Sequence, residues 1–455
     1  MSSSVFRWDK AFTRKFWLVA LPIVIQNLVS SSLHIIDGVM IGQLGDAPYA
    51  AVTQANRYTF VFQLFTFGAA SGCGIFFSQL WGKRDVPQMR RVMALAFRIT
   101  LGLALLFAGC ALLMPDKVIG LFLPEGESAR YGAAYLSLVA PGYFIFAIDT
   151  VYATCMKSAE QTRIPMTAGV TSILTNTFLN WVLIYGHLGF PALGVRGAAI
   201  ATVISACVSL AINTTASYAL RLPSAIRPRE LGLPDRDFLK RFARLVTPVV
   251  FNEGLWSMGT TMYGVFYGRL GDAAVAAMGM YNTVDQLVNV LVYGIMNASA
   301  ILVGGYLGAG DREGAWLTAR RMLAACIAAG AAVGVLMAFG RGALVGLFKV
   351  SQEAQGIAMT ILLEASLFYW LRAINSINVV GILRSGGDTL YSMVLDTAAL
   401  WLIGVPLVGL AALAWKLPIQ QVYLFTFVEE AIKATIGLRR FRSKKWMHVL
   451  TEKEA

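Results

Sequence analysis

The chain has 455 residues, of which 57% are hydrophobic and only 14% are charged, whereas a typical soluble domain carries roughly 25% charged residues. With a mean hydropathy of +0.63, this composition excludes a soluble enzyme, a disordered protein and a coiled coil. The net charge of +13 does not indicate a nucleic-acid partner, because the basic residues lie between long apolar stretches. Those stretches are continuous, which excludes an alternating outer-membrane β-barrel and predicts a polytopic helical membrane protein.

Twelve apolar stretches are long enough to cross a bilayer as helices, which takes about 20 residues each. The first contains about 27 residues and would reach roughly 40 Å as a helix, so we expect it to tilt, bend or protrude. The predicted fold class is therefore an all-α integral membrane protein with twelve transmembrane helices. The stretches cover about residues 16–42, 52–80, 92–114, 132–156, 165–186, 195–220, 242–268, 276–307, 319–340, 356–382, 391–411 and 418–438.

Basic residues determine the expected topology. Lys and Arg are concentrated in every second connection, and the opposite connections are poorer in them. The positive-inside rule then places both termini in the cytoplasm, as an even number of spans requires. We expect a multi-pass protein of the cytoplasmic (inner) membrane. The basic segments are residues 7–15, 83–91, 157–163, 227–244, 312–321, 384 and 439–445.

The two halves of the chain repeat each other. Pro22 matches Pro248 at an offset of 226, and the register continues without a gap to Asp85 and Asp311. Because six spans separate the halves, they share one orientation and are parallel repeats. Such a repeat predicts two lobes with a cleft between them and alternating access by rocking. The expected organisation is an N-terminal lobe (1–220), a linker (221–241), a C-terminal lobe (242–438) and a basic tail (439–455).

The repeat has one irregularity. Gly120 and Gly346 still keep the offset of 226, but Thr162 matches Thr389 only after a slip of one residue.

Several segments resemble those of multidrug and toxic compound extrusion (MATE) transporters, in an order that covers essentially the whole chain. The resemblance implies two pseudo-symmetric six-helix lobes in a V shape. It also implies export of cationic or amphipathic compounds, driven by a proton or sodium gradient. The segments are 21–37, 41–45 (Ile-Gly-Gln-Leu-Gly), 197–202 (Gly-Ala-Ala-Ile-Ala-Thr), 252–256 (Asn-Glu-Gly-Leu-Trp) and 383–389 (Leu-Arg-Ser-Gly-Gly-Asp-Thr).

Asp37 is the strongest candidate for ion coupling. An ionisable side chain at bilayer depth is costly unless it faces a cavity or a partner. The resemblance implies a proton and cation site at this aspartate, as in the DinF-like branch, with bending of the helix at Pro22. Proline lacks an N–H and weakens a helix. A proton and a cationic substrate would then compete for one charge. The alternative is a solvated aspartate at the outer end of the helix.

Asn176 and Asn180 lie at i and i+4 and share one helix face. In the same branch, an asparagine and an aspartate occupy these places, so Asn180 removes one titratable group. The two amides can hydrogen-bond Asp37, or they can complete a sodium site with it. The alternative is ordinary hydrogen bonding between membrane helices.

Glu253 is the second candidate for coupling. NorM-like members carry a coupling glutamate on this helix, and counting from Gly271 places it at Trp256, one turn away from Glu253. A plain ion pair with Arg244 or another lobe contact is the alternative. The NorM-like aspartate of the tenth span falls near Ala373, so that site is absent here.

Other charged residues within the spans favour structural roles. We expect Glu429 and Lys433 to form an i, i+4 ion pair and Asp396 to pair with Arg372. Glu364 lies two turns before Arg372, which is too far for an easy direct contact. Asp149 and Asp285 also sit in apolar surroundings.

Substrate contacts are expected from aromatic, thioether and polar side chains, which suit cations through cation–π contacts and adaptable packing. The partners implied are organic cations and the lipid bilayer, and we expect a monomer. One alternative is a flippase-like exporter of a lipid-linked or other amphipathic substrate. The candidate contacts are His34, Thr202, Trp256, Met262 and Tyr263.

We expect neither a cofactor nor an enzyme. The five cysteines lie singly in apolar stretches, where small core residues are expected rather than disulfides or metal ligands. No zinc spacing, phosphate-binding motif or nucleophile motif is present. A membrane-embedded enzyme is the remote alternative, with Asp37 and His34 as the only close acid–base pair.

Overall fold

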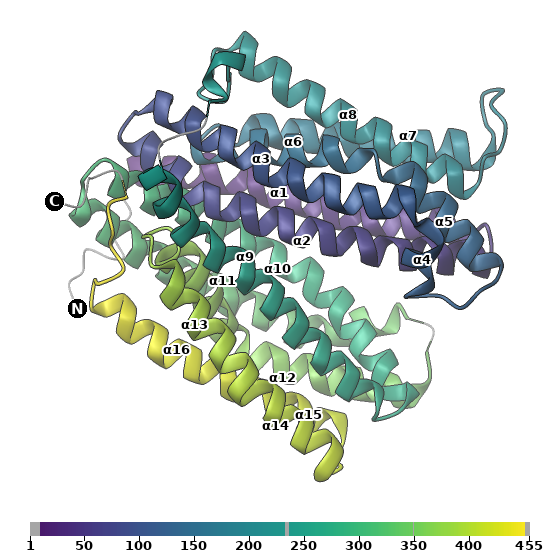
Figure 1. Ribbon diagram of the computed structural model, residues 1–455. Helices are drawn as coiled ribbons and strands as arrows, with labels where there is room; N and C mark the ends of the chain where they lie inside the picture. The colour runs from purple at the N-terminus through teal and green to yellow at the C-terminus, as the bar shows by residue number, and fades with distance from the viewer. Residues whose placement is uncertain (1–9, 233–235, 349, 451–455) are drawn as a thin grey trace. The chain divides into compact units, whose positions relative to one another are not determined.

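The computed structural model describes residues 10–232, 236–348 and 350–450, leaving out the side chains of residues 33–35 and 228. Every regular element in these residues is helical (Figure 1). The first half of the chain forms α1 (Lys10–Gly42), α2 (Asp46–Gly82), α3 (Val86–Leu113), α4 (Pro115–Gly120), α5 (Glu127–Val139), α6 (Gly142–Ser158), α7 (Arg163–Tyr185) and α8 (Val195–Ala219).

The second half begins with the short helix η1 (Pro228–Glu230). It continues with α9 (Arg236–Gly268), α10 (Asp272–Gly308), α11 (Arg312–Gly346), α12 (Gln352–Ser376), η2 (Ile377–Leu383), α13 (Thr389–Ala399), η3 (Leu400–Gly404), α14 (Val405–Gly409), η4 (Leu410–Ala414), α15 (Ile419–Leu424) and α16 (Thr426–Arg442). The elements η2, η3 and η4 are π-helical turns. Such turns are rare and occur mostly as single interruptions of α-helices.

The expected all-helical membrane architecture is confirmed. In the described residues, eight helical segments are long and apolar enough to cross a membrane. A ninth is the pair α5–α6, which bends by 49°. With the more polar α7, α9 and α15–α16, the helices follow the twelve apolar stretches of the sequence in order.

The chain divides into two compact units. The N-terminal unit comprises residues 25–81 and 85–242, and the C-terminal unit comprises residues up to 24, 82–84 and from 243 onward. Apolar side chains of the first turns of α1, including Phe12, Phe16 and Val19, belong to the same buried cluster as residues of α10, α11 and α12. The start of α1 therefore groups with the second half of the chain, and α1 continues from one unit into the other between Val24 and Ile25.

The sequence repeat is visible in matching helix caps. Asp85 and Asp311, related by the offset of 226, precede α3 and α11 with nearly equal backbone angles, φ −88° and ψ 74° against φ −85° and ψ 81°. Each carboxylate accepts a hydrogen bond from a backbone N–H three residues later, at 3.1 Å from Gln88 and 2.8 Å from Gly314. These caps satisfy N–H groups that a helix start leaves free.

Gly197 allows α7 and α8 to pack closely. A Cβ atom at this position would lie only 2.5 Å from the carbonyl oxygen of Leu183. We expect Gly197→Val to lower the stability of the purified protein by about 1–3 kcal/mol, the usual cost of overpacking. Thermal unfolding followed by size exclusion measures this. Gly102→Val is the matched control, since no atom lies within 4 Å of its added Cβ, and equal melting of both variants would contradict the prediction.

Candidate ion-coupling site

Asp37 lies in a cluster of neutral amides within the N-terminal unit. The Asn180 Nδ2 group donates to Asp37 Oδ1 at 2.7 Å and to Asn176 Oδ1 at 3.0 Å. Asn176 and Asn180 are 2% and 1% exposed, and Asp37 is half-buried. Because four residues separate the two asparagines on α7, both face α1. The structure thus brings together the three residues that the sequence suggested.

The described partner of the Asp37 carboxylate is a neutral amide. In the portion of the chain that the structure describes, Asp37 forms no ion pair. Tyr135 of α5 lies within electrostatic range of Asp37 and interacts with Thr202 of α8. Its hydroxyl also donates to Asn56 Oδ1 at 3.4 Å. Sequence reasoning missed Tyr135 and Asn56 as neighbours of the site.

The helix that carries Asp37 is continuous through its proline. Pro22 is buried inside α1, and the helix runs on to Gly42. Pro22 lies two residues before the boundary between the units. Bending at Pro22 therefore stays a prediction. The side chain of His34 lies outside the described part of the structure, and its predicted contact with the substrate stays a prediction.

Glu253, the second candidate, forms a buried ion pair. Its Oε1 atom lies 2.6 Å from Arg384 Nη1, and the two side chains are 13% and 3% exposed. Arg384 follows η2, and Glu253 lies in the middle of α9. The partner is Arg384 and not Arg244, the partner suggested from sequence. A coupling role for Glu253 stays a prediction, but its charge is compensated within the C-terminal unit.

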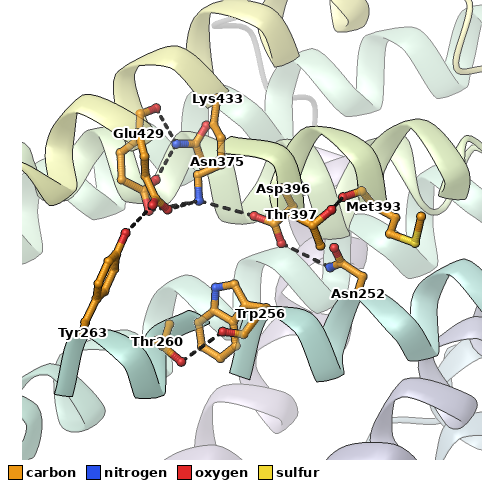
Figure 2. A network of polar contacts seen from close by, with 11 residues as sticks. Asn252, Trp256, Thr260, Tyr263, Asn375, Met393, Asp396, Thr397, Glu429 and Lys433 are labelled. Carbon is orange, nitrogen blue, oxygen red and sulfur yellow. Dashed lines mark hydrogen bonds and ion pairs between the residues drawn. The ribbon is translucent and has the colours of Figure 1, made fainter. Parts of the chain in front are cut away.

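Lys433 lies at the centre of a second polar network, drawn in Figure 2. Its Nζ atom is 2.9 Å from Glu429, 3.3 Å from Asp396 and 3.4 Å from Glu430. The predicted Glu429–Lys433 pair is therefore confirmed. Three carboxylates surround one ammonium group that is only 4% exposed.

Polar side chains of α9 and α12 complete this network. Asn252 Nδ2 of α9 donates to Asp396 Oδ2 at 3.1 Å, and Asn375 Nδ2 of α12 donates to the backbone oxygen of Glu430 at 2.7 Å. The Tyr263 hydroxyl donates to Glu429 Oε2. The network thus ties α9, α12 and α13 to α16.

The predicted pair of Asp396 with Arg372 is wrong. Arg372 Nη1 lies 2.7 Å from Asp285 Oδ1 and donates to the Tyr281 hydroxyl at 2.7 Å. The reason is packing, since α12 contacts α10, which carries Asp285, whereas α13 contacts α16, which carries Lys433. Glu364 forms no ion pair among the described residues, and its Oε2 atom is buried without a hydrogen-bond partner.

The predicted substrate contacts occupy different settings. Trp256 is 39% exposed and lies on the side of α9 that faces the Lys433 network, near Tyr263 (Figure 2). Met262 is half-buried. Thr202 donates to the backbone oxygen of Ala198 at 2.9 Å and lies beside the Asp37 cluster through Tyr135. Their contacts with a substrate stay predictions.

The partners of the buried cations in the C-terminal unit therefore differ from the partners of Asp37 in the N-terminal unit. In the C-terminal unit, the spanning cations Arg372, Arg384 and Lys433 are all paired with carboxylates. In the N-terminal unit, Asp37 is held by neutral donors and keeps a charge that can bind a proton or a cation. No group of three or more His, Cys, Asp or Glu suited to a metal ion occurs in the described ranges. A sodium ion at Asp37 would depend on the two amide oxygens.

Comparison with known proteins identifies relatives along the whole chain. A model of the MatE family matches residues 22–182 and 248–410. The chain is 26% identical to a probable multidrug resistance protein NorM from Thermotoga maritima, over 94% of this chain and 92% of that protein. It is 25% identical to the multidrug resistance protein MdtK from Edwardsiella ictaluri, over 89% and 88% of the two chains.

Solved structures share the fold. A MATE transporter in its straight conformation superposes with a TM-score of 0.86 at 19% identity, over 98% of this chain and 99% of that one. A variant of the Vibrio cholerae MATE transporter VcmN gives a TM-score of 0.87 at 18% identity, over 97% and 98%.

The two matched stretches of the family model begin at Pro22 and Pro248, where the sequence repeat also begins. The predicted resemblance and the predicted fold class are both confirmed by these matches. Since the family model covers well over half of the sequence, the chain belongs to the MatE (multidrug and toxic compound extrusion) family of membrane transporters.

Proposed function

We propose that the protein exports cationic or amphipathic small molecules across the cytoplasmic membrane in exchange for protons. In this proposal both termini are cytoplasmic and the protein works as a monomer. Access to the two sides alternates, and Asp37 is the group that holds either the proton or the cation. The names of the relatives, several of which are multidrug resistance proteins, support a drug-like substrate.

The observation that carries the proposal is the neutral environment of the Asp37 carboxylate. Its partner Asn180 is almost completely buried and uncharged. A carboxylate without a fixed counter-ion in a membrane helix is stable when it binds a proton or a mobile cation. Because the two ligands need the same charge, binding of one displaces the other. This competition is the requirement for antiport.

The hydrogen bonds favour a proton over sodium as the coupling ion. The Asn180 NH2 group contacts both Asp37 Oδ1 and Asn176 Oδ1. It therefore lies between these two oxygens and occupies the space in which one sodium ion could bind both of them. A proton needs only the carboxylate itself. Pro22, just before the point where α1 leaves the C-terminal unit, supports bending of this helix during the cycle.

The flippase-like alternative would need free cationic groups for a pyrophosphate or a similar anion. Arg372 is one such cationic group, in the tenth span. Its guanidinium group is bound to Asp285 and Tyr281, and Arg384 and Lys433 also face carboxylates. The charges therefore support a cationic substrate.

Transport in proteoliposomes tests the proposal. We would load a fluorescent organic cation and follow its movement under a proton gradient alone, then under a sodium gradient at equal pH on both sides. We expect movement against the cation gradient with protons only. Movement driven by sodium only would overturn the choice of ion. Failure of the cation to move under either gradient, together with transfer of a lipid-linked carrier, would favour the alternative.

A further inference from the structure

A second carboxylate without a counter-ion lies in the N-terminal unit, away from Asp37. Asp149 of α6 accepts hydrogen bonds from Ser209 Oγ and Asn213 Nδ2 of α8, each at 2.7 Å. Both donors are neutral and buried. None of the ion pairs among the described residues involves Asp149. Its position is therefore electrostatically similar to that of Asp37.

A free acceptor lies directly beside this carboxylate. The Asn213 side chain is 1% exposed, and its Oδ1 atom is buried without a hydrogen-bond partner. A buried amide oxygen that lacks a donor is costly. A protonated Asp149 or a water molecule held beside it would provide such a donor. The unpaired oxygen thus points independently to a proton-carrying ligand at Asp149.

Among the described residues, the charged and titratable groups near Asp149 form no ion pair with it. Lys157, two turns further along α6, is the one cation whose charge acts on it appreciably. From α3, Arg90 is bound to Glu230 at 2.8 Å. Tyr152 of α6 and Tyr218 of α8 contact each other through their hydroxyl groups at 3.3 Å.

The other cations on the packed helices are Arg91 and Arg98 of α3, Arg163 of α7 and Arg196 of α8, and among the described residues none of them forms an ion pair with Asp149. The remaining titratable groups on these helices are neutral phenols and thiols, namely Tyr143, Tyr185, Cys110, Cys155 and Cys207. Arg98 donates instead to backbone oxygens.

A row of polar side chains on α8 extends between the membrane depths of Asp37 and Asp149. On α8, successive polar residues are spaced three or four positions apart, so they share one face. This row extends over about 22 Å of helix, roughly two thirds of the hydrocarbon thickness. Ser172 of α7, one turn from Asn176, donates to the backbone oxygen of Ser205 at 2.7 Å and joins the two helices. The row consists of Thr202, Ser205, Ser209, Asn213 and Ser217.

The row continues past Asp149 to the end of the unit. Ser217 Oγ donates to the Asn213 backbone oxygen at 2.7 Å, and it contacts Ser224 Oγ at 2.7 Å. Lys157 and Arg163 lie at the same end, where α6 ends and α7 begins. By the positive-inside rule this is the cytoplasmic end. Asp37 lies near the C-terminal, non-cytoplasmic end of α1, at the other end of the polar row.

We propose that Asp149, with Ser209 and Asn213, forms a second proton-binding site that passes the proton from Asp37 to the cytoplasm. The inference rests on the proposed proton antiport. The proton leaves the carboxyl group of Asp37 and travels through water molecules hydrogen-bonded to the hydroxyl row. It then binds the Asp149 carboxylate and leaves from there to cytoplasmic water. Direct transfer is excluded because two to three helical turns, about 10–16 Å, separate the two levels.

Two transport assays on Asp149→Asn test this role. Proton-driven net export needs the relay, whereas exchange of labelled for unlabelled substrate at equal pH does not. We expect net export to fall on the order of 100-fold, the lower end of the effect of removing a positioned proton-transfer group. Exchange should keep its wild-type rate. A purely structural role for Asp149 would reduce both rates together.

Controls separate this inference from the proposed function. Asp272→Asn removes an exposed aspartate at the start of α10 and should leave both assays unchanged. If the wild type itself shows no proton-driven export, the proposed function fails and this inference fails with it. If the wild type exports but Asp149→Asn does so equally well, or loses exchange in parallel, only the relay is overturned.

A milder variant serves if Asp149→Asn does not fold. Ser209→Ala keeps the carboxylate but removes one of its donors. Hydrogen bonds to the charged form of a carboxylate favour that form. We therefore expect the pH profile of net export to move to higher pH, while exchange at equal pH is unaffected. An unchanged profile in a folded Ser209→Ala protein would overturn the proposal.

Discussion

Asp37→Asn should abolish proton-driven export of an organic cation. The variant keeps the shape of the side chain but removes both the titratable group and the negative charge. It also removes the charged acceptor of the Asn180 hydrogen bond. Hydrogen bonds to charged groups contribute about 1.5–3 kcal/mol, so we expect substrate binding to weaken roughly 10- to 100-fold. Net export in proteoliposomes and binding by equilibrium dialysis measure the two effects.

The matched control for this variant is Asp46→Asn. Asp46 lies at the exposed start of α2, in the same unit as Asp37, and we expect wild-type transport from it. Wild-type export by a folded Asp37→Asn protein would move coupling away from Asp37. Glu253 would then become the first residue to test, with Arg384 as its partner.

Lys433→Met should cause the largest loss of stability among single substitutions in the C-terminal unit. It leaves Asp396, Glu429 and Glu430 facing one another without their shared cation. Breaking a buried ion pair from one side costs about 3–5 kcal/mol, because the remaining charge stays buried and uncompensated. We expect the melting temperature of the purified protein to fall by roughly 5 °C or more, measured by differential scanning fluorimetry.

Two comparisons distinguish charge from loss of packing in this result. Lys445→Met removes an exposed lysine and should leave the melting temperature unchanged. Adding Glu429→Gln to Lys433→Met removes one unpaired carboxylate and should restore part of the loss. A melting temperature of Lys433→Met equal to that of the wild type would show that the network does not hold these helices together.

The Asp37 cluster was predicted from the resemblance to MATE transporters, and spacing alone placed only Asn176 and Asn180 on one helix face. An i, i+4 pair such as Asn176 and Asn180 has only one common face, and a carboxylate within an apolar stretch needs polar neighbours. The Glu429–Lys433 pair followed from the same spacing rule. The helical spans were predictable because their apolar runs are long and continuous.

Partners on different helices were harder to predict. Asp396 and Arg372 lie in adjacent spans along the chain, but each pairs with a residue of another helix, Lys433 of α16 and Asp285 of α10. Arg384 lies 131 positions from Glu253, and no spacing rule connects residues that far apart. Tyr135 of α5 and Asp37 of α1 likewise lie far apart in the chain.

The π-helical turn η2 is suited to hold one residue more than a regular helix. The repeat offset is 226 at Gly346 and 227 at Thr389, so the second half has one more residue than the first between these points, and η2 lies inside this interval. An extra residue in an α-helix would rotate everything after it by about 100°, whereas a π turn absorbs it locally. Arg384 directly follows η2 and pairs with Glu253, so the rotation of the chain after this turn decides whether the ion pair can form.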